Sequence, residues 1–142
     1  MIEAIHMLQE WDGQSSIGIA QVEEHSSPAP RLHRQDGAID WSQPAVQIAN
    51  RIRGLKPWPG SFTHWQRDAN PLRLIIEQVH VVAAPSDRPA GQILQLAEEG
   101  IHVATGDGVV VIEQLTPAGK RTMASADFLR GYPLAAGNQL KS

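Results

Sequence analysis

The chain has 142 residues, 42% of them hydrophobic and 19% charged, which suits one small folded core and excludes disorder through charge repulsion. It has no cysteine and no apolar run near the roughly 20 residues of a membrane helix. Its N-terminus also lacks the basic stretch followed by an apolar stretch that is typical of a signal peptide. Disulfides, thiolate metal sites and cysteine nucleophiles are thereby excluded, and we expect a cytoplasmic protein with no membrane partner. The formal net charge is −3, yet residues 28–75 carry seven Lys or Arg against three Asp.

The first predicted element is a short helix at the N-terminus. Apolar residues recur there every three positions, as on one helix face: Ile2, Ile5, Leu8 and Trp11. Gly13 then acts as a stop. About ten helical residues are not stable alone in water, so this face predicts a partner surface. The stretch that follows, with Pro28 and Pro30 and little periodicity, is typical of an extended linker.

A second helix is predicted after Trp41. Ser42 is a suitable N-cap, and Pro44 suits the first turn because its missing N–H is not needed there. One face of this helix is apolar: Ala45, Ile48, Ala49, Ile52 and Leu55. Arg51 and Arg53 fall on other faces, and Gly54 with Pro57 ends the helix.

Strand patterns follow. The candidate strands are residues 62–66, 72–82, 92–97, 101–105 and 109–115. Gly106-Asp107-Gly108 is a strong hairpin signal between the last two, and Ser125 is a suitable cap for a short terminal helix that ends at Gly131. Short strands with glycine turns predict a mainly β fold, a small barrel preceded by one helix, with the terminal helix covering one opening.

Several motifs, each weak alone, occur in a specific order. They are DGAIDWSQP at 36–44, PWPGSFT at 57–63, GQIL at 91–94, GIHVATGDG at 100–108, LTPAGKR at 115–121 and ADFLRG at 126–131, with Ile48 and Ile52-Arg53 between the first two. Together they cover about residues 30–131 and resemble the C-terminal domain of methionyl-tRNA formyltransferase.

The resemblance implies an open, OB-like barrel that helps hold initiator tRNA. A separate N-terminal domain of the family transfers the formyl group from 10-formyltetrahydrofolate, using an Asn, a His and an Asp. By the same resemblance, residues 1–12 are the last helix of that domain, 13–38 the interdomain linker and 39–142 the OB-like domain. The catalytic residues and the folate pocket have no counterpart here. We therefore expect this chain alone to be inactive, with no catalytic residue, no metal and no cofactor of its own.

The basic middle segment supplies the candidate tRNA-binding side chains. They are Arg31, Arg34, Arg51, Arg53, Lys56, Arg67 and Arg73. Phosphate contact is expected of them more than base stacking, because proteins read the shape of folded RNA mainly through its backbone. Trp41 and Trp58 lie in the same segment, and we expect both to pack the helix against the barrel.

For the remaining candidate motifs, a structural role is better supported than a catalytic or metal-binding role. His64, His80 and His102 lack the close spacing of metal ligands and suit surface or partly buried structural positions. Residues 25–28, His-Ser-Ser-Pro, echo the family's catalytic histidine stretch only superficially and lie in the linker. Gly106-x-Gly108 is too short to bind phosphate, and Ser125 with Asp127 has no histidine to complete a triad.

Three alternatives stay open. The chain could be an interaction module that completes a separately encoded formyltransferase through the Ile2, Ile5, Leu8 and Trp11 face. It could be the barrel domain of a sugar or folate formyltransferase, in which tRNA plays no part. It could also be a gene fragment with no independent function, left by a truncation or a misplaced start.

Overall fold

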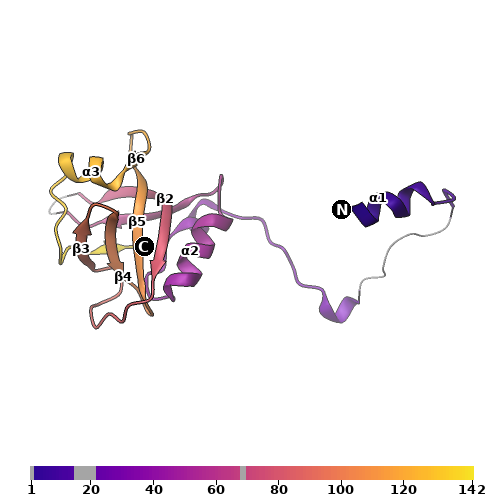
Figure 1. The fold of residues 1–142 in the computed structure, drawn as a ribbon, viewed down its shortest axis with the longest axis horizontal. Coiled ribbons are helices and arrows are strands. Elements are labelled where there is room, and N and C mark those ends of the chain that lie inside the picture. Colours follow the sequence, from indigo (N-terminus) through magenta and orange to yellow (C-terminus); the bar gives the residue numbers. More distant parts are fainter. Residues whose placement is uncertain (1, 15–21, 68–69) are drawn as a thin grey trace. The chain divides into compact units, whose positions relative to one another are not determined.

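The computed structural model describes residues 2–14, 22–67 and 70–142, and the chain divides into two units, Met1–Arg31 and Leu32–Ser142. The first unit contains helix α1 (Ile2–Gln9) and the 3-10 turn η1 (Glu23–His25) (Figure 1). Residues 15–21 of the predicted linker, and the side chain of Ile2, lie outside the described part. No helix in the described ranges is long and apolar enough to cross a membrane.

The second unit is built on one curled antiparallel sheet. Its strands are β1 (Ser61–Trp65), β2 (Leu72–Val82), β3 (Ile93–Ala97), β4 (Gly100–Ala104), β5 (Val109–Pro117), β6 (Met123–Ala124) and β7 (Leu140–Lys141). Their order is β3-β4-β5-β2-β1-β7, with β6 paired to β5. The curl returns β7 towards β3, because the N–H of Leu140 donates to Gly91 O and that of Ile93 to Asn138 O. The predicted mainly β, OB-like barrel is confirmed.

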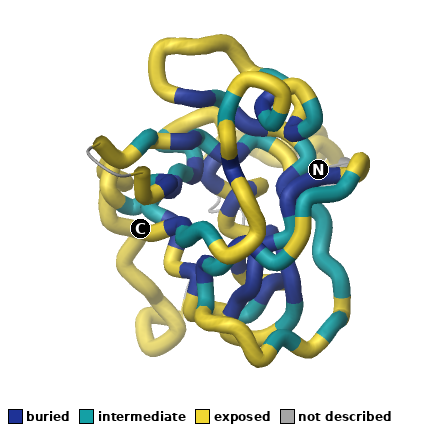
Figure 2. The backbone as a smooth tube through the Cα atoms, turned by 90° about the vertical axis from the view of Figure 1, so that its left-hand side faces the viewer, coloured by how far each residue is buried: buried dark blue, intermediate teal, exposed yellow. Residues whose placement is uncertain are grey.

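Helix α2 (Ala45–Gly54) supplies apolar side chains to the core of this barrel. All five positions of its predicted apolar face are buried: Ala45, Ile48, Ala49, Ile52 and Leu55. Ala45, Ile48 and Ile52 meet inward-facing strand residues such as Leu74, Ile76 and Ile112 in one cluster. Figure 2 shows buried residues gathered towards the middle of the tube and exposed residues in the loops at its periphery. Helix α3 (Ser125–Gly131) lies on the other side of the barrel from α2 (Figure 1) and packs its buried Phe128 into the same cluster.

Two predicted helix caps are wrong. The residue before α2 is Pro44, and Ser42 instead donates both its backbone N–H and its hydroxyl to the Asp40 carboxylate. A charged oxygen two residues away is the stronger acceptor, so it takes the serine out of the capping position. Ser125 lies inside α3, where its buried hydroxyl donates to the carbonyl of Ile112 in β5. Burial requires a partner, and the sheet provides one.

Of the two tryptophans predicted to pack the helix against the barrel, only one is buried. Trp41 is buried, as expected, and its indole N–H donates to Thr63 Oγ1 at 3.0 Å. Trp58 is 52% exposed, so its predicted packing role is wrong. Trp58 comes after α2 has ended, in the turn from Pro57 to Gly60, where it lies beyond the buried face of the helix.

A close backbone contact fixes the segment before α2. Gly37 ends the 3-10 turn η2 (Arg34–Gly37), and a Cβ placed on it would lie 2.0 Å from the carbonyl oxygen of Gly60. The next residues continue along β1, since Ile39 N–H donates to Phe62 O at 2.9 Å. Any larger residue at 37 would therefore push η2 off the Gly60 turn.

Replacing Gly37 by alanine should lower the free energy of unfolding by about 1–3 kcal/mol, the usual cost of overpacking. The matched control is Gly54→Ala, because a Cβ on Gly54 meets nothing within 4 Å. There alanine should raise stability by up to about 1 kcal/mol through its better helix propensity. Urea unfolding followed by circular dichroism measures both, and equal effects of the two substitutions would contradict the close-contact argument.

Candidate nucleic-acid interface

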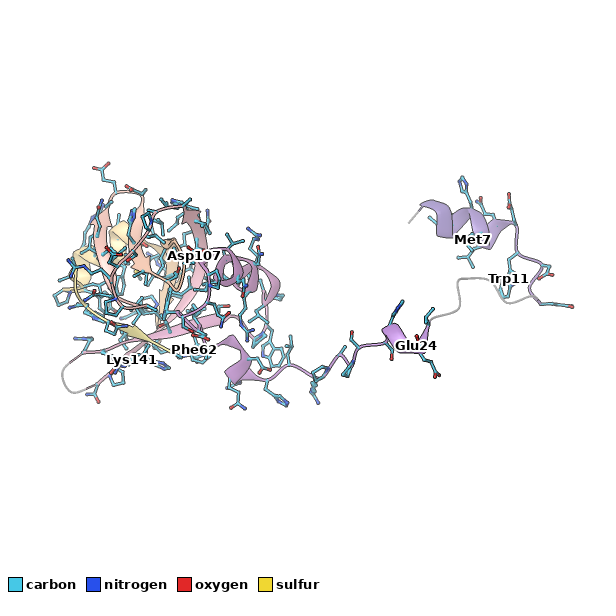
Figure 3. All side chains as sticks on the ribbon, turned by 90° about the horizontal axis from the view of Figure 1, so that it is seen from below. Met7, Trp11, Glu24, Phe62, Asp107 and Lys141 are labelled. Carbon is cyan, nitrogen blue, oxygen red and sulfur yellow. The ribbon has the colours of Figure 1, made fainter. Side chains whose placement is uncertain are left out.

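The outer face of β1 and β2 carries an aromatic and cationic cluster. The register pairs Phe62 with Ile75 and His64 with Arg73, and paired residues project on one side of a sheet. The guanidinium carbon of Arg73 lies 4.1 Å from the centroid of the Phe62 ring, within cation–π range. Phe62 also meets the His64 ring edge-on, with centroids 5.6 Å apart. Figure 3 labels Phe62 on this strand pair, and Lys141 of β7 is paired with His64 on the other edge of β1.

Lys56 connects the end of α2 to this face. Its ammonium group donates to the carbonyl of Glu77 in β2 and lies 3.8 Å from the Glu77 carboxylate. Glu77 follows Arg73 and Ile75 at alternate positions of the strand, and so lies on the same outer side. Lys56 is thus held at the α2 end of the face, with part of its charge balanced locally.

Arg34 and Arg51 lie on the other side of the Gly60 turn. Arg34 opens η2, which is packed against that turn through Gly37. Arg51 projects from α2 and donates to the backbone carbonyl of Asp36 in η2. We call Arg34, Arg51, Lys56 and Arg73 the cationic face. The first three lie on elements next to the start of β1, and Arg73, which is opposite His64 in the register, places its guanidinium over the ring of Phe62.

The structure does not bring the other three candidates to this face. Arg53 lies two residues from Arg51, hence on a different flank of α2, and donates to Asn50 there. Arg67 follows the far end of β1, with its guanidinium carbon 5.3 Å from the centroid of a Trp65 ring. Arg31 belongs to the first unit and is not placed relative to the barrel.

Sequence reasoning missed the aromatic partners of these cations. Phe62 and His64 alternate along β1, so a period of two would have placed them on one face beside the neighbouring strand. The exposure of Trp58 had no comparable signal, because the turn in which it lies has no periodicity. The pairing of Arg73 with Phe62 depends on the register of β1 with β2, which no short motif specifies.

Comparison with known proteins places the chain in a family. Residues 31–133 match the family described as formyl transferase, C-terminal domain. The chain belongs to this family.

Two relatives show how far the similarity extends. The chain is 47% identical over 109 residues to the methionyl-tRNA formyltransferase of Roseiflexus castenholzii, covering 77% of this chain and 34% of that protein. It is 38% identical over 142 residues to the methionyl-tRNA formyltransferase of Rhodopirellula baltica, covering 98% of this chain and 42% of that protein. The chain therefore spans between a third and a half of the length of these relatives, and the resemblance drawn from its motifs is confirmed.

The fold is shared more widely than the sequence. A crystal structure of a HypX variant from Aquifex aeolicus superposes with a TM-score of 0.62 at 18% identity, covering 92% of this chain and 22% of HypX. At that identity the likeness concerns the formyl transferase C-terminal fold alone.

Two histidines of this formyl transferase C-terminal domain, His80 and His102, each pair with one acid. His80 Nδ1 lies 2.9 Å from Glu113 Oε1, and His102 Nε2 lies 3.0 Å from Glu99 Oε1. Within the described ranges no group of three or more His, Cys, Asp or Glu side chains could hold a metal ion.

Asp40 gives the domain a pH-dependent contact beside the cationic face. Hydrogen bonds from the Ser42 hydroxyl, the Gln43 amide and the Ser42 backbone N–H lower the pKa of the Asp40 carboxyl below its usual 3.8, with a smaller contribution from Arg51. A pKa depressed by folding stabilises the folded state above the ordinary value, and this stabilisation is lost as the pH falls through the folded value.

Replacing Asp40 by asparagine should therefore destabilise the domain near neutral pH, and the difference should shrink as the pH falls below about 3.8. The effect should be small, because the carboxylate is exposed and screened by solvent. Urea midpoints measured at a series of pH values test this. Ser42→Ala removes the largest contributor and should reproduce part of the change, whereas a pH-independent difference would rule this account out.

Proposed function

We propose that this formyl transferase C-terminal domain binds initiator tRNA through its cationic face. The single observation that carries the proposal is the arrangement of Arg34, Arg51 and Lys56 next to the start of β1, with Arg73 held over the Phe62 ring. Eight relatives at 36–47% identity are methionyl-tRNA formyltransferases, which supports this choice of RNA. Initiator tRNA as the ligand also implies a cytoplasmic site of action.

The chemistry of the face suits phosphate groups. A guanidinium stacked on a ring keeps its N–H donors in the guanidinium plane, so Arg73 can bind a phosphate without leaving Phe62. Arg51 is likewise oriented by Asp36 O, and Lys56 by Glu77. These contacts hold the cations in place before RNA arrives, which reduces the entropy lost on binding.

The affinity of the domain alone should be modest. Glu77 and Asp36 lie among the cations, so the local excess of positive charge is small. If all four cations contact phosphates, the logarithm of the binding constant should fall with the logarithm of salt concentration with a slope of about −3. In a complete formyltransferase, a catalytic domain using 10-formyltetrahydrofolate would supply the rest of the affinity and all of the chemistry.

Titration of fluorescently labelled initiator tRNA into the full chain at low and at high salt tests this function. Arg73→Ala should weaken binding several-fold at low salt and reduce the salt slope by about one, since one phosphate contact is lost. The control is Arg130→Ala, which removes an equal charge from α3, where Arg130 pairs with Asp127 at 2.9 Å. α3 and α2 lie on opposite sides of the barrel in Figure 1.

No detectable binding at low salt would overturn the proposed function. Equal losses for Arg73→Ala and Arg130→Ala would show that binding depends on net charge and not on this face. A sugar or folate formyltransferase role, the alternative without RNA, predicts the first of these results.

A second proposal concerns the first unit. Ile5 and Leu8 on α1 are 51% and 58% exposed, so an apolar face is available for a partner. The match to the Rhodopirellula baltica protein covers 98% of this chain and so extends into this unit. We propose that residues 1–12 pack as the last helix of a formyl transferase catalytic domain, with residues 13–38 as the connection and 39–142 as the barrel domain.

Co-expression with the catalytic domain of a methionyl-tRNA formyltransferase tests this pairing. The full chain should co-purify with it, and the double substitution Ile5→Asp and Leu8→Asp should abolish the complex, because two charges cannot be buried against an apolar surface. Val46→Asp is the control, an exposed apolar residue of α2 at 58% exposure. Co-purification that survives the α1 change would contradict the proposal.

A further inference from the structure

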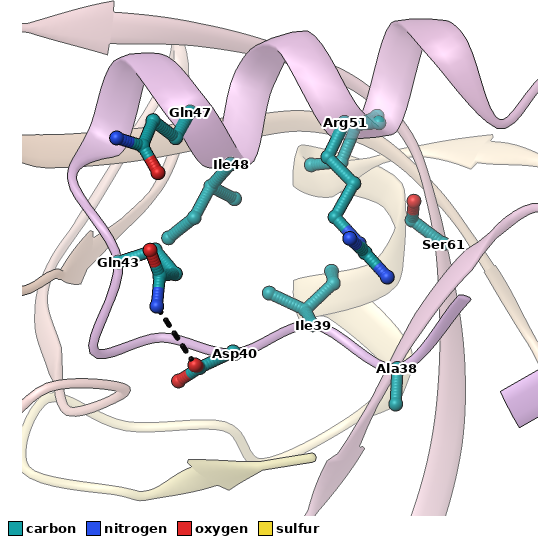
Figure 4. Close-up of a pocket in the computed structure, with 9 residues that line it drawn as sticks. Ala38, Ile39, Asp40, Gln43, Gln47, Ile48, Arg51 and Ser61 are labelled. Carbon is teal, nitrogen blue, oxygen red and sulfur yellow. Dashed lines mark hydrogen bonds between the residues drawn. The ribbon is translucent and has the colours of Figure 1, made fainter. Parts of the chain in front are cut away.

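A pocket opens between α2 and the segment that leads into it. It has a volume of about 490 Å³ and is bounded by α2, by residues 38–43 and by the start of β1 at Ser61. A volume of this size is in the range of small-molecule sites. Figure 4 shows Arg51 descending from the helix towards the Ser61 side, and Gln43 with Asp40 at the opposite end.

Ser61 gives this pocket an unused hydrogen-bonding group. The described chain has four buried polar residues, and three of them bond: Thr63 with Trp41 and Lys141, Thr105 with Asp107 and Gly108, and Ser125 with Ile112. Ser61 is 2% exposed and lines the pocket, yet its hydroxyl has no partner. A buried polar group without a partner destabilises the fold, so a bound ligand oxygen at this hydroxyl would restore what is missing.

The two ends of the pocket carry different charged and polar groups. Arg51 has five N–H donors, one of which goes to Asp36 O, so the guanidinium can still bind an anion at the Ser61 end. At the other end the Asp40 carboxylate is bonded by Ser42 and by Gln43 Nε2 at 3.1 Å. One end therefore offers a cation and a hydroxyl, and the other offers side-chain amides beside an anion.

The wall between these ends is apolar. Ile39, Ile48 and Ile52 line the pocket, and because each shows no more than 3% of its surface there, they present a narrow apolar strip to a ligand. Aliphatic side chains of this kind pack against the face of a planar ring, while the amides of Gln43 and Gln47 can bond the ring's edge. The pocket thus has an anion-binding end at Arg51 and Ser61, then an apolar wall, and then an end with the side-chain amides of Gln43 and Gln47.

We propose that this pocket binds a single nucleotide, its phosphate on Arg51 and Ser61 and its base against the isoleucine wall, edge-on to Gln43 and Gln47. The inference rests on the proposed RNA-binding function in one respect, the choice of a nucleotide over other anions with a planar ring. The nucleotide is either a free mononucleotide or an unpaired residue of a bound RNA, and both present the same chemistry.

Nuclear magnetic resonance of the ¹⁵N-labelled full chain tests the pocket. The four nucleoside 5′-monophosphates and the matching nucleosides are titrated to about 10 mM, a range that detects millimolar affinity. The monophosphates should shift the backbone amides of Ile39, Asp40 and Ser61, and the nucleosides should bind at least several-fold more weakly, since they lack the group that Arg51 recognises.

Two variants with one matched control assign the residues. Arg51→Ala should weaken monophosphate binding about tenfold, whereas Arg53→Ala, on the same helix but outside the pocket lining, should leave it unchanged. Ser61→Ala should raise the urea midpoint of the free protein and yet weaken the binding of the monophosphate. A serine with only a structural role would not change the affinity.

The outcomes separate this pocket from the proposed function. No amide shifts, equal binding of nucleosides, or equal effects of Arg51→Ala and Arg53→Ala would overturn the nucleotide pocket, even where the domain binds tRNA in a salt-sensitive way. Monophosphate binding without tRNA binding would overturn the proposed function and leave the pocket. When both bind, displacement of the monophosphate by a single-stranded trinucleotide but not by a blunt RNA duplex assigns the ligand to unpaired RNA, and no displacement by either assigns it to a free nucleotide.

Discussion

Burial of one side of α2 in the barrel is the interaction on which the other features depend. The curled sheet leaves an open end, and Ile48 and Ile52 fill it together with inward residues of β2 and β5. Removing this apolar surface from water contributes roughly 1.5–3 kcal/mol per fully buried isoleucine. Because the buried side of the helix is fixed, its remaining sides are fixed too. Arg51 must then project towards η2 and the pocket, and Arg53 away from them.

The cations are oriented by contacts with neighbouring groups, and these contacts have little effect on the stability of the fold. Arg73 uses an aromatic ring, Arg51 a backbone carbonyl, and Lys56 a carbonyl together with a partly exposed carboxylate. Exposed pairs of this kind add little stability, so their main effect is on side-chain orientation. A protein domain can in this way present ordered positive charge while the whole chain stays acidic at −3. The proposed binding of phosphates would therefore depend on the orientation of these cations more than on net charge.

The sequence predicted what depends on local periodicity. The 72–82 strand matches β2, and the five apolar positions of α2 are all buried. The Ser42 cap failed because Asp40 competes for the same hydroxyl at short range, which a capping pattern does not consider. β7 was not predicted, since two residues carry no alternation, and only pairing with β1 defines them. The pocket at Ser61 could not be foreseen either, because it joins three segments through tertiary packing.

The pairing of β7 with β1 bears on how the chain folds during synthesis. Thr63 in β1 donates to the carbonyl of Lys141, 78 residues later, and Leu140 N–H reaches back to Gly91. Until residues 138–141 have left the ribosome, one edge of β1 has no partner strand. An open edge is a template for pairing with other chains. The nascent barrel is thus exposed to aggregation for most of its translation, and contacts this distant in sequence make the last step of closure intrinsically slow.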